Sequence, residues 1–557
     1  MAFVGLENEA PVGTPGSVFN TMNQTDAGLN FTPVRNDSPA ASMNFPPATL
    51  GSSVTNDADL QCLTTRPGID PPTQHRASLF PLARPRALGN IILQIEEIDE
   101  LFNIRYPFVG PCQPISYPLR YIKYNHPYLP LIDEKKSPHE YDERSDLLFW
   151  VIMAVAARRQ KSQPTLLPRL ARNVTDLLWK TLRSMSYSIS TIRALCLLCT
   201  WPFPTSSSTS DPTFMLVGTM LQMSTQMGLH CAFDAQDFAK VPLNLDVSEH
   251  SKWAQTWEAC NIVAISVSIG CGLPLFFQMY ESPSASQFES SPAESPFYLR
   301  LQIERFKLRV SLSLARPVPA GAEGALTRER STMYHLLNSD LDELEKRFSG
   351  SSDIEDWYLM AARLHLQAFY LFDHHAMEGY KNRIVALFST AYNLVDLSQR
   401  LNERPQGLFD YYPFFCYQTY VNAAFVLLKI LTNGFFNTII DAKAGKQLLE
   451  SSITGLRQMS VVNNDLPARL GDIIGFFCAL PDPAVVGGVT IRDLQLKQVR
   501  NRLSMSVVYD CLWIWRRHFQ THQLDTDGSN NIQDKFYFNL VLQLKTYLAL
   551  LRNDCLK

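Results

Sequence analysis

The sequence predicts an all-α protein, a large helical array preceded by a disordered N-terminal tail. From residue 90 onward, apolar residues recur every three or four positions, and strand-like alternation is nowhere sustained. Residues 1–88 are instead rich in Pro, Ser, Thr and Asn without an apolar period, as disordered segments are. We therefore divide the chain into a tail (1–88), an all-helical domain (89–525) and a C-terminal helix (526–557).

Helical segments follow one another along the whole domain. In residues 90–102, Ile91, Ile92, Ile95, Ile98 and Leu101 are spaced as one buried helical stripe. Residues 282–296 and 315–325 are rich in Pro, Ser, Gly or Ala, and we expect them to be exposed connections. Further helices are predicted at residues 143–160, 168–187, 211–228, 246–269, 324–348, 353–403, 409–434, 444–461, 490–520 and 531–553.

One helix shows both end signals and a methionine stripe. Asp211 and Pro212 predict its N-cap and first turn, and Gly228 predicts its end. Methionine fills irregular gaps between packed helices, so we expect the stripe to be core rather than a ligand site. The stripe consists of Leu216, Met220, Met223 and Met227.

Charge and cysteine usage limit the classes of function. With 50 basic and 53 acidic residues, the net charge of -3 lacks the cationic excess of a chain that binds nucleic acid by itself. The 11 cysteines lie mostly in apolar contexts, which favours reduced thiols inside the cell, and the N-terminus does not resemble a signal peptide. The uncharged stretch 259–280 is interrupted by Asn, Ser, Gly and Pro, so we expect a buried helix end and no membrane contact.

Motifs for catalysis or metal binding are weak. Cys196 and Cys199 form C-x-x-C, but a helix beginning at Ser190 places both thiols on one apolar stripe, and no second ligand pair completes a zinc site. His374 and His375 are predicted on a helix, where adjacent side chains point about 100° apart. Phosphate-binding loops, dinucleotide turns and nucleophile elbows are absent from the sequence. The sequence thus predicts no enzyme activity, no catalytic residue and no cofactor.

Stretches in fixed order resemble the middle homology region of fungal zinc-cluster (Zn2Cys6) transcription factors. They are the segment 124–133, the helix 147–158, the stretch from Ser190 to a Gly-Leu-His ending, and the helix and turn 253–274. A further stretch, 501–516, resembles a terminal helix of the branch that includes the leucine-biosynthesis regulator and the protease activator. The motif residues are His126, Pro127, Pro130, Gly228, Leu229, His230, Trp253, Trp257, Pro274, Trp513 and Trp515.

The resemblance implies a nuclear regulator of RNA polymerase II genes that acts through an all-helical domain. In full-length relatives, an N-terminal six-cysteine cluster holds two zinc ions and presents a DNA-reading helix. Before residue 190 this chain has only Cys62 and Cys112, so we expect the cluster to be missing. We therefore expect the chain to hold zinc only if the cluster is restored. We expect it to contact DNA only indirectly, or through a region that a missing exon encodes. Residues 105–120 interrupt the family pattern, as an insertion or a retained intron would.

The expected partners follow from the same resemblance. They are a homodimer or a heterodimer with a zinc-cluster relative, the transcription machinery, and a small-molecule effector. A second reading stays open, in which the chain is a co-regulator that does not bind DNA, or a small-molecule-sensing interaction protein. Salt-dependent DNA binding distinguishes the two. In either case we expect the four tryptophans among the motif residues to anchor helix packing.

Overall fold

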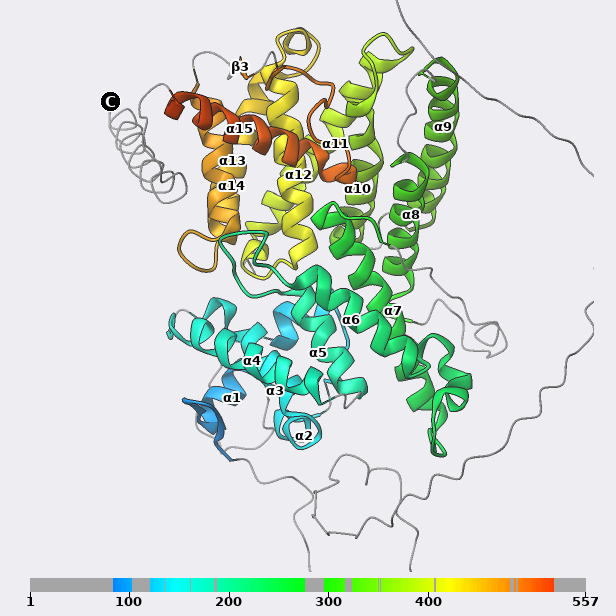
Figure 1. The fold of residues 1–557 in the computed structure, drawn as a ribbon, viewed down its shortest axis with the longest axis vertical. Helices are drawn as coiled ribbons and strands as arrows, with labels where there is room; N and C mark the ends of the chain where they lie inside the picture. The colour runs from blue at the N-terminus through cyan, green and yellow to red at the C-terminus, as the bar shows by residue number, and fades with distance from the viewer. Residues whose placement is uncertain are drawn as a thin grey trace, which may run out of the picture. The chain divides into compact units, whose positions relative to one another are not determined.

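The prediction of an all-α fold is confirmed, because the described residues form helices with only two short two-stranded sheets (Figure 1). Several predicted segments lie wholly or mostly outside the described residues. They are the tail up to residue 83, the segment 105–120, the C-terminal segment 526–557 with its predicted helix 531–553, and most of the connections 282–296 and 315–325. The structure, a computed structural model, describes residues 84–102, 121–134, 136–160, 162–184, 188–275, 295–315, 323–348, 350, 352–404, 407–480, 485–486 and 489–524.

The elements are labelled in chain order in Figure 1. The strands pair as two antiparallel hairpins, β1 with β2 and β3 with β4. The bounds are β1 (Arg86–Leu88), β2 (Ile91–Leu93), α1 (Ile95–Phe102), α2 (Pro138–Arg144), α3 (Asp146–Ala156), α4 (Leu166–Arg183), α5 (Ile189–Thr200), α6 (Thr213–Gln226), α7 (Val247–Cys271), α8 (Tyr298–Leu314), α9 (Glu323–Phe348), α10 (Asp353–Gln367), α11 (Tyr380–Asn402), α12 (Phe414–Thr432), α13 (Ala442–Met459), α14 (Leu466–Ala479), β3 (Val485–Val486), β4 (Val489–Thr490) and α15 (Ser506–Leu524).

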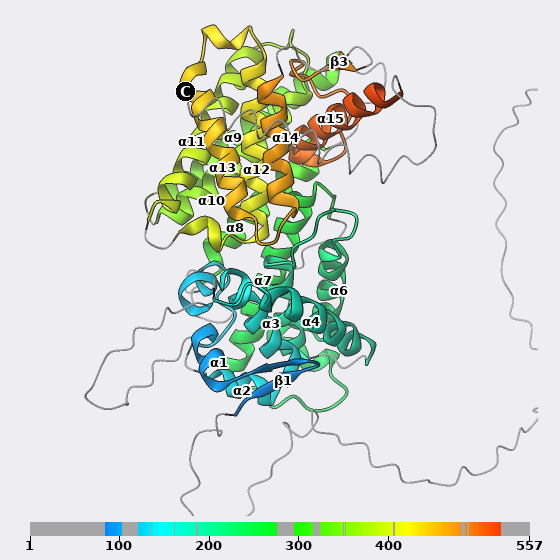
Figure 2. The ribbon, with the colours of Figure 1, turned by 90° about the vertical axis from the view of Figure 1, so that its left-hand side faces the viewer.

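The described helices enclose two hydrophobic cores. Elements β1 to α6, which we call the N-terminal group, pack around one core, and α8 to α15, the C-terminal group, pack around the other. Helix α7 runs from one group into the other (Figures 1 and 2). Trp257 and Val263 on α7 belong to the first core, and Ile265 and Ile269 belong to the second. We call the boundary between the two groups the seam.

Local signals at both ends define α7. Asp246 caps its first turn, accepting from the Glu249 N–H at 2.8 Å in a capping box. The helix ends at Gly272, whose φ of +63° favours glycine, and a Cβ there would lie 2.6 Å from the backbone oxygen of Arg502. The 25 residues between span about 37 Å, long enough to contact both cores. The helix end that we expect within residues 259–280 is therefore confirmed.

Helix α12 is the most apolar long helix in the described part of the chain. By length and composition it is the one helix there that could cross a membrane, but 83% of its apolar window is buried inside the protein. It packs against α11, α13, α15 and α7. It is therefore a core helix of the C-terminal group.

The predicted helix 90–102 is wrong over its first residues. Gly89, with φ of +57°, and Asn90 form a two-residue turn between β1 and β2, which favours a hairpin. Ile91 is buried while Ile92 is 63% exposed, an alternation that belongs to a strand. Residues 86–88, which the sequence assigned to the tail, form β1, and the helix begins only at Ile95.

Two other long helix predictions fail where tertiary contacts compete with helical periodicity. In the segment 353–403, α10 ends at Gln367 and continues as a short 3₁₀ helix, Ala368–Phe372; a turn follows, and the chain resumes as α11 after Gly379, which has φ of +71°. His374 and His375 lie exposed in that turn, not on a helix. In 490–520 the α-helix begins only at Ser506. Helices α2, α8 and α14 were not predicted.

Candidate functional site

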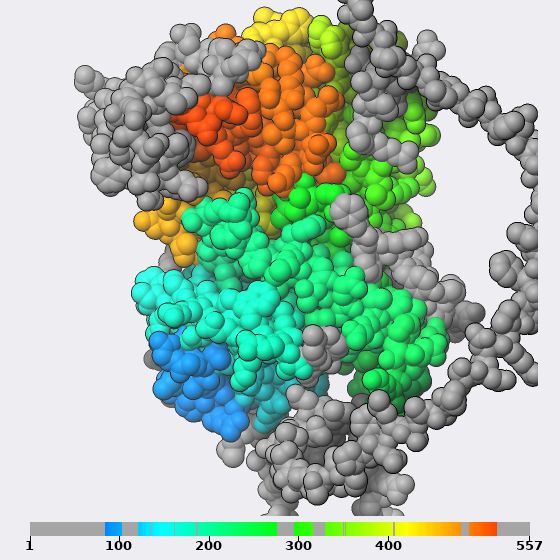
Figure 3. Space-filling model, viewed as in Figure 1, coloured from blue at the N-terminus to red at the C-terminus, as the bar shows by residue number. Residues whose placement is uncertain are grey.

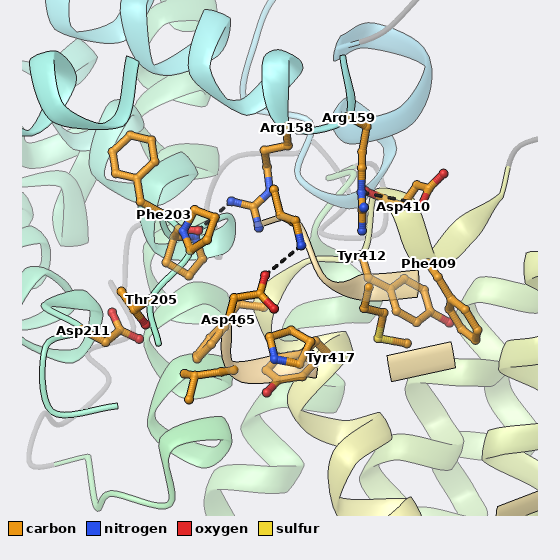
Figure 4. A pocket seen from close by; sticks show the side chains of 17 residues that line it. Arg158, Arg159, Phe203, Thr205, Asp211, Phe409, Asp410, Tyr412, Tyr417 and Asp465 are labelled. Atoms are coloured by element: carbon orange, nitrogen blue, oxygen red, sulfur yellow. Dashed lines mark hydrogen bonds and ion pairs between the residues drawn. The ribbon is translucent and has the colours of Figure 1, made fainter. Parts of the chain in front are cut away.

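A small pocket lies on the seam between the two helix groups (Figure 4). Its volume is about 60 Å³ and it opens to solvent. The segments that form it are far apart in the sequence, and both groups contribute. It is lined by Arg158, Arg159, Pro202, Phe203, Pro204, Thr205, Asp211, Phe409, Asp410, Tyr412, Phe414, Tyr417, Met459, Val461, Asp465, Leu466 and Pro467.

Arg158 enters the pocket from the end of a buried helix. Helix α3 is apolar and buried from Leu147 to Ala156, and a short 3₁₀ turn, Ala157–Arg159, carries the first charges after it. Nη1 of Arg158 donates to the carbonyl of Pro202 at 2.6 Å. Desolvation, with a smaller contribution from the neighbouring Arg159 charge, lowers the pKa of Arg158 to about 10, while Asp465 acts in the opposite direction. Arg158 is therefore a charged group at neutral pH in a poorly solvated place.

Arg159 ties the two helix groups together. Its Nε donates to the Asp410 carbonyl at 2.9 Å, Nη1 to the Ser460 carbonyl at 2.8 Å, and Nη2 to the Gln458 carbonyl at 2.8 Å. The Asp410 carboxylate lies 3.6 Å from Nε. Desolvation lowers the pKa of Arg159, and the charges of Asp410 and Asp465 oppose that shift. One side chain of the N-terminal group thus uses its whole guanidinium on backbone carbonyls of the C-terminal group.

Two aspartates besides Asp410 line the pocket, and backbone donors hold each in place. Asp465 caps α14 through Oδ1, which accepts from the Ala468 N–H at 3.4 Å, and its Oδ2 accepts from the N–H groups of Val461 at 2.7 Å and Val462 at 3.2 Å. Asp211 accepts through Oδ1 from the Thr213 N–H at 2.9 Å and from the Thr213 hydroxyl. Figure 4 shows both carboxylates at the pocket with Arg158. The predicted N-cap is therefore one residue off: the N-cap of α6 is Pro212 and the helix begins at Thr213, while Asp211 precedes the cap and still accepts from the Thr213 N–H.

The segment 124–133, singled out as a family motif, also lies at the seam. The Tyr124 ring stacks on that of Tyr411, with centroids 4.1 Å apart and planes 5° apart. The Tyr128 ring meets the Tyr412 ring edge-on at 6.5 Å. Trp201 Nε1 donates to the Tyr411 carbonyl at 3.1 Å. The motif therefore contacts the same turn, residues 408–412, that Arg159 binds.

A further contact joins the C-terminal group to the end of α7. Nη1 of Arg502 donates to the carbonyl of Cys271 at 3.3 Å, where α7 ends. In the space-filling view, the green surface around α7 meets the orange surface of the chain near residue 500 (Figure 3). The contacts described here therefore involve the middle of the C-terminal group's sequence, at residues 408–412 and 458–460, and its last part, at Arg502.

The remaining motif residues lie in packing positions that do not line the pocket. His126 is buried, with Nε2 3.2 Å from Glu134 Oε1, and burial lowers its pKa while Glu134 opposes the shift. The His230 ring meets those of Phe238 and Trp257 edge-on, at 4.9 and 6.0 Å. Gly228 has φ of +78° and ends α6, as predicted. Trp257 and Trp515 are buried, and Trp253 and Trp513 are half-buried. The assignment of these residues, and of Pro127, Pro130, Leu229 and Pro274, as motif positions of the family stays a prediction.

The cysteine pair lies in the N-terminal core. Cys196 and Cys199 are fully buried, and the Cys196 Sγ lies 3.3 Å from the Met220 Sδ, so the predicted packing of thiols and methionines is confirmed. The helix N-cap is Ser188 and not Ser190, because the Ser188 hydroxyl accepts from the Thr191 N–H. No group of three or more His, Cys, Asp or Glu side chains in the described ranges could hold a metal ion. The missing zinc cluster itself stays a prediction.

Sequence reasoning found Arg158 only as the last residue of a motif stretch and missed the pocket. Its walls come from loops that no periodic pattern marks, and Arg159 contacts carbonyls 251 to 301 residues away. The one available signal was the basic pair Arg158 and Arg159, which follows the uncharged stretch 147–157. Charge at the end of a buried apolar segment needs partners, and these turn out to be carbonyls across the seam.

Comparisons with known proteins agree with the resemblance. The model of the fungal specific transcription factor domain matches residues 119–283. The chain is 23% identical over 530 residues to the regulatory protein LEU3 of Saccharomyces cerevisiae, covering 85% of this chain and 55% of that protein. It is 23% identical over 528 residues to the putative transcription factor SEF1 of Kluyveromyces lactis, covering 90% of this chain and 44% of that one.

The chain thus spans about half the length of the curated relatives it matches. Among solved structures, the K. lactis CBF3 core is similar over 75% of this chain and 80% of that chain. The TM-score of that match is 0.39 and the sequence identity is 13%.

Proposed function

From the premise that residues 119–283 are a fungal specific transcription factor domain, we propose that this chain is a nuclear regulator of RNA polymerase II genes. The domain match is the observation that carries the proposal. The 23% identity with LEU3 in an alignment that covers 85% of this chain supports it, since that relative is a regulatory protein. The proposed activity is regulation and not catalysis.

The proposed mechanism is conformational. Helix α7 contributes to both cores, and polar contacts of Arg159 and Trp201 with the turn 408–412 join the two groups across the seam. A partner or effector that prefers one arrangement of the two groups shifts the population toward it. The surface presented to the transcription machinery changes with that arrangement.

We further propose that the chain acts on DNA as one member of a dimer with itself or with a zinc-cluster relative. The net charge of -3 supports this part, because it leaves the chain without the cationic excess that non-specific DNA binding requires. The helical domain then contributes regulation while its partner contributes most of the DNA affinity.

A tethering experiment tests the proposal. The full chain is fused to an unrelated DNA-binding domain in a fungal host, and transcription of a reporter carrying that domain's sites is measured. We expect several-fold activation or repression relative to the DNA-binding domain alone. A matched variant, Leu427→Asp, places a charge at a fully buried position of α12 and should abolish the effect. A stable, nuclear fusion that leaves the reporter unchanged would contradict the proposal.

A further inference from the structure

The seam pocket contains two charged groups of opposite sign whose hydrogen-bonding capacity is only partly used. Arg158 donates only through Nη1, to the carbonyls of Pro202 and Trp201, and no described residue accepts from its Nε or Nη2. Asp211 accepts only through Oδ1, and no described donor reaches its Oδ2. The other charged residues of the lining, Arg159, Asp410 and Asp465, are bonded to their neighbours as described above.

The Nε and Nη2 groups of Arg158, which no described residue accepts from, are arranged to bind a carboxylate. Within the described chain, no carboxylate approaches Arg158 within the 4.0 Å of an ion pair, whereas the adjacent Arg159 has Asp410. A poorly solvated guanidinium without a close counter-ion is unfavourable. Nε and Nη2 form a planar fork that matches the two oxygens of a carboxylate. A ligand carboxylate would supply the acceptors that the protein does not.

Asp211 favours a cationic group at another place in the same pocket. Its Oδ1 is fixed by the Thr213 N–H and hydroxyl, which leaves Oδ2 oriented by the same turn. Counting all charged residues of the lining, three aspartates exceed two arginines, so a simple anion would be poorly matched. A ligand that carries both a carboxylate and an ammonium group matches both signs.

The rest of the lining limits the ligand's size and polarity. Aromatic rings of Phe203, Phe414 and Tyr417 form much of the wall. A volume of about 60 Å³ is below the 300–1,000 Å³ typical of pockets for drug-sized ligands. The pocket has room for the small charged part of a ligand, and any side chain of that ligand lies at the opening to solvent.

We propose that the seam pocket binds a small free amino acid, with its carboxylate on the fork of Arg158 and its ammonium group on Asp211. Because Arg158 and Asp211 belong to the N-terminal group while Phe414 and Tyr417 belong to the C-terminal group, the bound amino acid contacts both groups. It would therefore stabilise one arrangement of the seam. This last step rests on the proposed function, but binding itself does not.

Calorimetric titration of the full chain tests the chemistry of the ligand. The probes are L-alanine, β-alanine and 4-aminobutanoate, which separate the two charges by increasing distances, with propanoate and ethylamine carrying one charge each. We expect one of the amino acids to bind at least about tenfold more tightly than either single-charge probe. The proposal is overturned if propanoate binds as tightly as the best amino acid, or if none of the amino acids binds at millimolar concentration.

Variants of the full chain locate the site. Arg158→Gln and Asp211→Asn should each weaken binding of the best amino acid about tenfold or more, while Arg172→Gln, on an exposed part of α4, should leave it unchanged. Asp211→Asn keeps the oxygen that accepts from Thr213, so it decides the question even where Arg158→Gln does not fold. Undiminished binding by Asp211→Asn would overturn the proposal.

The two proposals fail separately. A chain that binds the amino acid but does not affect the tethered reporter refutes the regulatory function and leaves the site intact. A chain that regulates the reporter but binds none of the amino acids refutes the site alone.

Discussion

Replacing Arg159 with alanine should loosen the seam more than any change at an exposed ion pair. The variant removes donors to three carbonyls of the C-terminal group. Hydrogen bonds to charged groups contribute about 1.5–3 kcal/mol each. The net loss is smaller than the sum of three such bonds, because the folded protein already bears the cost of desolvating the guanidinium, and carbonyls near solvent form hydrogen bonds to water in the variant. We therefore expect the free energy of unfolding to fall by about 3–5 kcal/mol, the range for removing one partner of a buried polar pair.

Denaturant unfolding of the full chain measures this loss, with hydrogen exchange of the 408–412 and 458–461 amides showing whether it is local to the seam. The matched control is Arg457→Ala. Arg457 pairs with Asp472 at 3.0 Å, but it is 47% exposed, so its loss should be below about 1 kcal/mol. If Arg159→Ala lowers stability no more than Arg457→Ala does, the view of Arg159 as the tie between the two groups is wrong.

Other predictions concern the ends of helices and buried charges. Gly272→Ala should lower stability by at least about 2 kcal/mol in chemical denaturation, because of its positive φ and the backbone oxygen 2.6 Å from the new Cβ; Gly218→Ala, with open space around it, should not lower it. Burial and a neighbouring lysine lower the pKa of His365 to about 3, so the unfolded chain binds a proton below about pH 6.5 that the folded chain does not. Stability should therefore fall by about 1.4 kcal/mol per pH unit between about pH 6 and 4, and a pH series on His365→Asn that shows the same slope would contradict this origin. Lys429→Met leaves Asp510 buried without its partner at 3.0 Å, and its unfolding midpoint should fall by the equivalent of about 3–5 kcal/mol; a change below about 1 kcal/mol would count against an important buried pair.

The fold was predictable where local signals and tertiary packing agree. Helices α6, α7 and α9 lie close to their predicted ranges, because apolar periodicity and end signals such as Gly228 and Gly272 coincide there. The predictions failed where tertiary contacts override periodicity. In residues 490–505, Asp510 accepts from the N–H groups of Gln498 and Val499, and Asn422 donates to the Ser504 carbonyl. These backbone groups are bonded to distant side chains instead of to a helix of their own.

The candidate site was less predictable than the fold, for a different physical reason. Tyr124 and Tyr128 are four positions apart in the segment 124–133, which the sequence marked without showing what its side chains contact. Their partners, Tyr411 and Tyr412, lie nearly 300 residues further along the chain. A pocket at the boundary between two cores is defined by which loops meet there, and periodicity carries no information on that pairing.

Helix α7 determines how a change at the pocket can reach the rest of the molecule. Rearranging the two groups requires α7 to bend or to repack against one of them. Its crossing region carries buried polar side chains, and Asn261 Nδ2 donates to the carbonyl of Trp257 four residues earlier at 2.9 Å, a contact typical of bent helices. One turn later, the Ser266 hydroxyl accepts from Nη2 of Arg300 on α8 at 3.2 Å. These buried polar contacts lie where α7 passes from one core to the other, so a bend of α7 at this point would change the relation of the two groups.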